Sequence, residues 1–357
     1  MSVQRPMLAR RRCLKSRHIG SGCSACVTIC PAGALAIVEK RLRFNPARCA
    51  GCGACASVCP SDALLFPAIS DDQLESAVRA AAQTGTVIFA SAQAVNAPTE
   101  AIRLPSVVWL SLAWLLFAAA EGTKKLVLIG AGESAEAKLG PVFEARLRTA
   151  RAILSELKSP MTIEHTVARA AVDAGRRALF SGWAKAAETP KAPEPPTESA
   201  RLRAAKLAAE PQIRTPESRE RLISALRRLR SQALQKPGVT AAPESPAAAA
   251  ALALPSVEAI RCTACGICTA VCPTGALTSE KSHGSETMSV SAEKCTACGL
   301  CADICFMHAM KIAPRGRLAD VIGREPIELM KRGTDRHALD TWEDKLSGMF
   351  SGPVYRT

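Results

Sequence analysis

Two short apolar runs with a longer one between them dominate the chain between residues 69 and 183. Thr86–Ala92 and Lys125–Gly130 have the length and composition of buried strands, and the run from Ser106 to Ala120 has the length of a helix. Strand, helix and strand in this order are typical of a βαβ unit, so we expect a small parallel α/β domain. Two helical segments are expected to follow, Pro141–Leu157 and His165–Phe180.

The uncharged run inside this domain raises the alternative of a membrane span. Seventeen residues separate Arg103 from Glu121, which is the lower end of the range that can cross a bilayer. Pro105 and two serines shorten the strictly apolar part. Because the run lies between two predicted strands, where a crossover helix belongs, we favour a buried helix.

Residues 184–256 are rich in Ala, Pro and Glu, a composition typical of a linker that is partly extended and partly helical. Within it, Thr215-Pro216-Glu217 predicts an N-cap, a proline at the first helical position and an acidic first turn. The helix that follows carries arginines on one face and an apolar stripe on the other, formed by Leu222, Ile223, Leu226 and Leu229. We expect it to lie on its own protein, and docking of an acidic partner is the alternative.

The first 22 residues are basic, with Arg10, Arg11 and Arg12 preceding Cys13. A twin-arginine export signal would require an apolar stretch next, but the chain runs directly into a cysteine motif. We therefore interpret this segment as a solvated basic arm.

Composition adds that 16 of the 357 residues are cysteine, eight between Cys13 and Cys59 and eight between Cys262 and Cys305. A secreted disulfide protein would be smaller and would scatter its cysteines, so this distribution indicates metal sites in a reducing compartment, the cytoplasm. The aromatic content of 4% argues against a stacking surface for single-stranded nucleic acid.

Three cysteine runs share the spacing C-x2-C-x2-C-x3-C, and they begin at Cys49, Cys262 and Cys295. Three cysteines in a tight loop reach three corners of one iron–sulfur cubane, while the fourth reaches a second cubane. Zinc is the alternative for any C-x2-C pair. A zinc site, however, needs only four ligands and does not require a fourth cysteine to recur at the same distance after each group of three. The third run has Phe306 in place of the following proline, and we expect its cluster to form with an altered potential.

The two cysteine-rich segments resemble the bacterial 2[4Fe–4S] ferredoxin family, and each contains the motif twice. In the first segment, Cys23, Cys26 and Cys30 recur as Cys52, Cys55 and Cys59. The resemblance implies four [4Fe–4S] clusters with crossed ligation. The implied ligand sets are Cys30, Cys49, Cys52 and Cys55; Cys262, Cys265, Cys268 and Cys305; Cys272, Cys295, Cys298 and Cys301; and Cys23, Cys26 and Cys59.

The last of these sets has only three ligands, because the family's first cysteine falls at Gly20. We expect Cys13 to be the fourth ligand, since Gly20-Ser21-Gly22 is flexible enough to let the chain return. His18 is the other candidate, because imidazole can replace a thiolate and would raise the potential. A labile or three-iron cluster is the remaining alternative.

Residues 85–157 are similar to the small iron–sulfur (delta) subunit of methyl-viologen-reducing hydrogenase and heterodisulfide reductase. The similarity lies in TVIFASA, IRLPSVVWLSLAWLL and KLVLIGAGES. That family carries cysteines where this chain has Ala90, Ser91 and Ala131, so its metal site is absent here and the domain would serve docking or scaffolding. Gly130-Ala131-Gly132 lacks the third glycine of a nucleotide loop and is interpreted as a tight turn.

Together these features predict an α+β multidomain protein in which two ferredoxin-like 2[4Fe–4S] modules flank a small parallel α/β domain and a Pro/Ala-rich linker. The expected parts are a first module with its basic arm (1–68), the α/β domain (69–183), the linker with its basic helix (184–256), a second module (257–315) and a C-terminal tail (316–357).

No Ser/His/Asp or paired-carboxylate arrangement can be argued from the chain, so we expect no catalytic residue and no cofactor beyond the clusters. The expected function is single-electron transfer, as a subunit or adaptor of a larger cytoplasmic oxidoreductase complex of the hydrogenase, heterodisulfide reductase-like or formate dehydrogenase type. The alternative is an iron–sulfur protein that senses redox state or oxygen or serves as a scaffold, which the departure at Gly20 would suit.

The formal charge of +14 shrinks once the clusters are included. Four oxidised centres with their thiolates carry about −8, which leaves about +6. We therefore expect redox protein partners with acidic docking surfaces within a hetero-oligomeric complex, and no nucleic acid. No membrane span is expected, and peripheral association with a membrane stays open.

Overall fold

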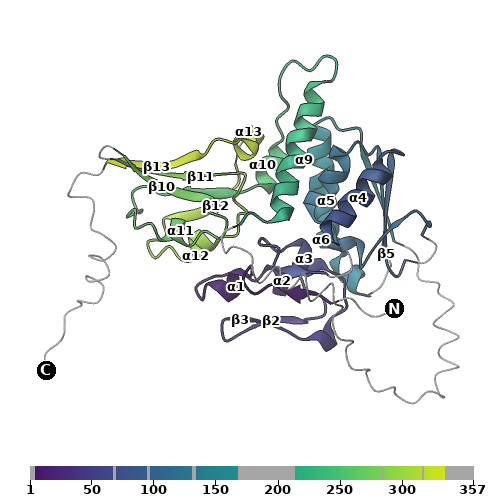
Figure 1. Ribbon diagram of the computed structural model, residues 1–357, viewed down its shortest axis with the longest axis horizontal. Helices are drawn as coiled ribbons and strands as arrows, with labels where there is room; N and C mark the ends of the chain where they lie inside the picture. The colour runs from purple at the N-terminus through teal and green to yellow at the C-terminus, as the bar shows by residue number, and fades with distance from the viewer. Residues whose placement is uncertain are drawn as a thin grey trace.

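The computed structural model describes residues 5–66, 70–94, 97–130, 134–167, 214–282, 285–315 and 317–333. They form a first cysteine module, an α/β domain and a second cysteine module, which Figure 1 shows around the long helix α9 (Glu217–Leu234). Buried apolar side chains of all three parts belong to one continuous core, from Leu35 through Val87 and Leu226 to Met288. Residues 168–183 of the expected α/β domain, 184–213 of the expected linker and 334–357 of the expected tail lie outside the described residues.

The first module closes on itself through two antiparallel strand pairs. Strand β1 (Met7–Leu8) pairs with β4 (Leu64–Leu65), and β2 (Leu35–Val38) pairs with β3 (Arg41–Phe44). Its helices are short: α1 (Leu14–Arg17), α2 (Ala25–Thr28), the 3-10 helix η1 (Pro46–Arg48) and α3 (Ala54–Ser57).

The predicted solvated arm is wrong for residues 5–22, because this segment supplies β1 and α1. Arg12, Cys13 and Leu14 are at most 8% exposed. Pairing with β4 satisfies backbone groups that an arm would leave to water, and burial of Leu14 holds the segment on the module.

The second module repeats the same plan. Its outer pair is β9 (Leu254–Val257) with β12 (Met310–Ala313), and its hairpin is β10 (Leu277–Ser282) with β11 (Ser285–Val290). Strand β13 (Ile327–Gly333) adds to the hairpin beyond residue 315, pairing antiparallel with β11. The helices are α10 (Pro246–Ala251), α11 (Ile267–Ala270), α12 (Leu300–Asp303) and α13 (Leu318–Ile322).

The α/β domain contains the expected parallel sheet, with strand order β6-β5-β7-β8. The predicted strands are β5 (Thr86–Ser91) and β7 (Lys125–Gly130), and two strands were not predicted, β6 (Ile102–Leu104) and β8 (Thr162–Val167). The remaining elements are α4 (Asp71–Ala82), the 3-10 helix η2 (Val107–Trp109), α5 (Leu112–Ala120) and α6 (Ser134–Glu156).

Three boundaries in this domain differ from the prediction. His165 lies in β8 rather than at the start of a helix, because residues 162–167 pair with β7, and the rest of that predicted helix, 168–180, lies outside the described residues. Helix α6 begins at Ser134 and includes Pro141. The apolar run starts as η2, capped by the Ser106 side chain, and becomes α-helical only at Leu112.

Helix α5 is buried, as predicted. Its residues from Ala113 to Ala120 are at most 6% exposed, and it packs against α9, α6 and α4. Within the described residues, no helix combines the length and apolarity needed to cross a membrane.

Helix α9 lies between α5 and the second module (Figure 1) and packs against α13 as well. The predicted apolar stripe is the buried face: Ile223, Leu226 and Leu229 are at most 2% exposed. The predicted N-cap is wrong by one position, since Pro216 is the cap and makes no side-chain hydrogen bond. Proline fits there because the first amides of a helix have no partner inside it.

Candidate metal centres

The cysteines of the first module fall into two neighbouring groups. Burial raises the pKa of Cys26 to about 12, and the nearby Cys59, Cys13 and Cys23 add to the rise. Burial likewise raises the pKa of Cys55, and Cys52, Cys49 and Cys30 surround it together with Cys26. We call the first group set 1 and the second set 2. Set 1 contains Cys13, Cys23, Cys26 and Cys59; set 2 contains Cys30, Cys49, Cys52 and Cys55.

The second module contains two corresponding groups. Burial raises the pKa of Cys268 to about 12, with further contributions from Cys265, Cys262 and Cys305. Burial also raises the pKa of Cys301, and the thiols near it are those of Cys298, Cys295 and Cys272, together with Cys268 of the first group. Set 3 contains Cys262, Cys265, Cys268 and Cys305; set 4 contains Cys272, Cys295, Cys298 and Cys301.

Backbone amides donate to sulfur at equivalent points of the motifs. Gly51 N–H donates to Cys49 Sγ and Ala264 N–H to Cys262 Sγ, each at 3.4 Å. The sulfur of the fourth cysteine of a motif accepts a hydrogen bond from the amide four residues further along the chain, at 3.2–3.3 Å. The pairs are Ala34 to Cys30, Ala63 to Cys59 and Ala309 to Cys305. Such donors stabilise the thiolate form, which is the form that binds metal.

The residue that carries this first amide has a positive φ: 69° at Gly51, 56° at Ala264 and 52° at Ala297. Glycine adopts this conformation freely, whereas for alanine it is a strained backbone state. Two alanines held in that state at the same motif position show that the loop geometry is imposed by its surroundings.

The four sets fit [4Fe–4S] clusters in donor number and chemistry. Each set offers four thiols, and one of them in each set, Cys26, Cys55, Cys268 or Cys301, is buried enough that its ionisation without a cation is unfavourable. In the described residues, no three His, Cys, Asp or Glu side chains meet where a single metal ion would be held. A cluster spreads its four thiolates over four irons, so its ligands need not converge on one point.

Cys13 is brought to set 1 by helix α1 and the turn that follows it. The Lys15 ammonium donates a hydrogen bond to the Ser21 carbonyl oxygen, and Ser21 N–H donates to the His18 carbonyl oxygen. The buried Ser21 hydroxyl then accepts a hydrogen bond from Cys23 N–H at 3.2 Å. The segment that was expected to be a flexible return is therefore a folded turn.

His18, the alternative ligand, lies at the C-terminal end of α1. Burial lowers the pKa of His18, and the nearby Arg17 lowers it further. Its ring takes part in lining a surface hollow of about 450 Å³ together with Arg10, Arg11 and Arg41.

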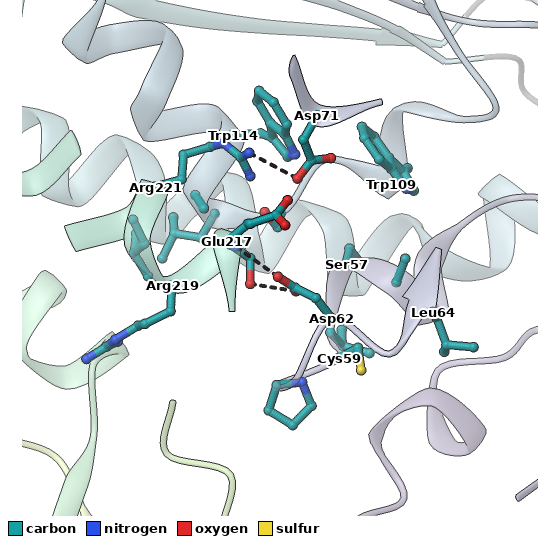
Figure 2. A pocket seen from close by; sticks show the side chains of 18 of the residues that line it. Ser57, Cys59, Asp62, Leu64, Asp71, Trp109, Trp114, Glu217, Arg219 and Arg221 are labelled. Atoms are coloured by element: carbon teal, nitrogen blue, oxygen red, sulfur yellow. Dashed lines mark hydrogen bonds and ion pairs between the residues drawn. The ribbon is translucent and has the colours of Figure 1, made fainter. Parts of the chain in front are cut away.

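A cavity of about 520 Å³ lies where the first module, the α/β domain and α9 meet. Figure 2 shows Cys59 and Asp62 on one side of it, with Trp109, Trp114 and Arg221 on the other. The Ser218 N–H and hydroxyl donate to the Asp62 carboxylate at 2.9 and 2.7 Å. Burial raises the pKa of Asp62 even though both hydrogen bonds act to lower it.

Two further charged side chains on the cavity wall, Arg221 and Asp71, form an ion pair. The Arg221 guanidinium stacks 3.8 Å from the centre of the Trp114 ring and forms an ion pair with Asp71 at 3.0 Å. None of these residues was identified from the sequence, because the partners come from three separate parts of the chain.

Comparison with protein families gives the class of these modules. The family model of the 4Fe-4S dicluster domain matches the chain twice, at residues 21–63 and 261–309. Cys13 lies outside the first match. Comparisons with curated proteins and with solved structures found no match. The similarity of residues 85–157 to the hydrogenase delta subunit is therefore unsupported, while the repeated 4Fe-4S dicluster domain indicates an iron–sulfur protein of the electron-transfer type.

Proposed function

We propose that the protein carries four [4Fe–4S] clusters in two ferredoxin-like modules and transfers single electrons between redox partners in the cytoplasm. The observation that carries the proposal is the grouping of sixteen cysteines into four sets of four neighbouring thiols. When bound, such clusters accept and donate one electron at a time.

The protein's own contribution is to hold thiolates, direct amides at sulfur and exclude water. Cys59 and Cys295 illustrate this, since burial raises the pKa of each thiol while backbone amides hydrogen-bonded to the sulfur oppose the rise. Burial, thiolate ligation and N–H donation to sulfur are the levers by which a protein sets cluster potentials. We assign the thiols of sets 1 to 4 as the ligands, with Cys13 completing set 1.

The partners we propose are redox proteins with acidic docking surfaces, within an oxidoreductase complex of the hydrogenase, heterodisulfide reductase-like or formate dehydrogenase type. Arg10, Arg11 and Arg41 of the first module are exposed around the hollow that His18 helps to line, which would suit such a surface. The arginines of α9, in contrast, bind within the chain: Arg221 pairs with Asp71, Arg227 with Glu293 and Arg230 with Glu244, at 2.9–3.0 Å.

Metal analysis of the full chain tests the proposal. Protein purified without oxygen should contain about sixteen irons and as many acid-labile sulfides per chain, as four cubanes require. Potentiometry followed by EPR should then resolve four reversible one-electron centres. Four zinc ions in place of iron would overturn the proposal, and a single oxygen-labile centre would favour the sensing function instead.

A further inference from the structure

The turn that lacks the first cysteine is where the first module contacts the second. Gly22 N–H donates to Asp303 Oδ2 at 2.7 Å. A Cβ atom on Gly22 would stand 2.9 Å from the same carboxylate, and one on Gly20 would stand 3.7 Å from Ile304 Cγ2. Asp303 lies at the end of α12, two residues after Cys301. Cysteine-bearing segments of the two modules therefore touch.

The missing cysteine leaves the Gly22 amide without the sulfur acceptor that the complete motifs provide at the same sequence position. In the complete motifs, the amide two residues after the first cysteine donates to that cysteine's sulfur, as Gly51 does to Cys49. Position 20 has no sulfur, so the equivalent amide, that of Gly22, is available for another acceptor. The Asp303 carboxylate accepts it, and the motif's missing ligand position becomes an inter-module contact.

Set 1 and set 4 are the two sets that face each other across this contact. Cys298 is among the side chains whose charges act on Cys23, together with Asp303. The N-terminal turn of α9 connects the same two sets, because Ser218 binds Asp62 beside Cys59 while Arg219 donates to the Ala292 carbonyl. Cys59 and Thr296, the neighbour of Cys295, line one cavity.

Within each module, a cysteine of one set lies near a cysteine of the other. Cys26 of set 1 is a near neighbour of Cys55 of set 2. Cys268 of set 3 is likewise a near neighbour of Cys301 of set 4. Helices α2 and α3 in the first module, and α11 and α12 in the second, pack against each other at these points.

We propose that the four thiol sets form one linear array in the order set 2, set 1, set 4, set 3. The contact between Gly20–Cys23 and Asp303 is the junction at which the array passes from the first module to the second. This inference rests on the proposed function, since electrons can pass along the array only if the sets hold clusters. Sets 2 and 3 are its two ends, so the two redox partners would dock on different modules. Asp303 is a positioning residue, because it acts through the turn and binds no iron.

Removing one cluster of the first module at a time tests the order. In the fully reduced full chain, Cys23→Ala should remove the set 1 centre and Cys49→Ala the set 2 centre, each with a loss of about four irons. We expect the set 4 EPR signal to lose the part of its splitting and fast relaxation that is caused by the set 1 spin in Cys23→Ala only, while its coupling to set 3 remains in both variants. An unchanged set 4 signal in Cys23→Ala would overturn the order, whereas an absence of iron from the parent protein would overturn the proposed function itself.

Asp303→Asn tests the junction without touching a ligand. Asp303 lies near set 1 as well as beside Cys301 of set 4, and removal of its negative charge favours the added electron. One centre of each module should therefore shift to a higher potential while the iron content stays unchanged. Asp320→Asn, an exposed position on α13 in the second module, should leave every potential where it is. A shift confined to the second module, or no shift at all, in Asp303→Asn would contradict the junction.

Discussion

The Cys13 thiol occupies a position that its motif cannot supply. It is 8% exposed, and it neighbours Cys23 and Cys26 although ten positions of chain separate it from the first of them. The Cys13 N–H is itself held by the Ala9 carbonyl at 3.2 Å, and α1 begins directly after it. A thiol fixed in this way needs little reorganisation to act as the fourth ligand of set 1.

Replacing Cys13 should therefore affect one cluster and leave three. In Cys13→Ala we expect a loss of between one and four irons per chain, as a three-iron centre or a lost cluster, with new or missing EPR intensity from set 1. His18→Ala is the matched control, five positions away on the same turn of chain, and should keep the full iron content. The opposite result, with iron lost only in His18→Ala, would make the imidazole the ligand.

Spacing in the sequence determines which cysteines share a loop, whereas the crossed ligand sets are implied by the resemblance to the ferredoxin family and stay a proposal, as does the assignment of Cys13. The inter-module contact was not, since it depends on Gly22 and Asp303, which are far apart in the chain and unremarkable in type. The missing cysteine was visible in the sequence as an irregularity. That the Gly22 amide donates to Asp303 instead of to sulfur could be recognised only from the structure, by comparison with the hydrogen bonds of the complete motifs.

At the scale of elements, α9 shows what a helical pattern does and does not predict. Its apolar stripe predicted the buried face correctly, because every fourth or third residue of a helix lies on one side. Its arginine face was consistent with either solvent or an acidic partner. The structure adds that acidic partners come from the chain itself, with Asp71 on α4, Glu244 before α10 and Glu293 in the second module.

Because α9 joins the α/β domain to the second module, its buried face should contribute strongly to stability. Leu226 is fully buried where α9 packs against α5, so Leu226→Ala removes apolar contacts and leaves a cavity. We expect a loss of about 2–5 kcal/mol in the free energy of unfolding, measured by chemical denaturation of the intact protein. Leu234→Ala changes the same side chain where it is 43% exposed, and should cost well under half as much. Equal losses in the two variants would mean that α9 is not held by this face.

For the whole molecule, the sequence predicted the parts better than their arrangement. The parallel order of β5 and β7 follows from a helical crossover between them, whereas β6 and β8 are short or carry polar residues such as Glu164 and give little signal. The position of the two modules against α9 depends on hydrogen bonds and ion pairs between distant segments, for which local patterns carry no information. These contacts are nevertheless what join three parts into one core.

The two cysteine modules and the α/β domain are stabilised in different ways, and this difference determines how each responds when the metal is removed. The described helices α1, α2, α3, α11 and α12 have four residues each, too short to be stable alone. The α/β domain instead has a four-stranded sheet and three longer helices around fully buried side chains such as Val87, Leu116 and Leu128. A strong iron chelator added with an oxidant should therefore unfold the cysteine modules first.

Amide hydrogen exchange before and after chelation measures this directly. We expect residues 23–59 and 262–305 to lose protection, while β5, β7 and α5 keep most of theirs. The matched condition is the same chelator without oxidant, which should leave intact clusters and unchanged protection throughout. Uniform loss of protection across all three parts would show that the clusters stabilise the shared core as well as their own loops, and that the molecule unfolds as a single cooperative unit.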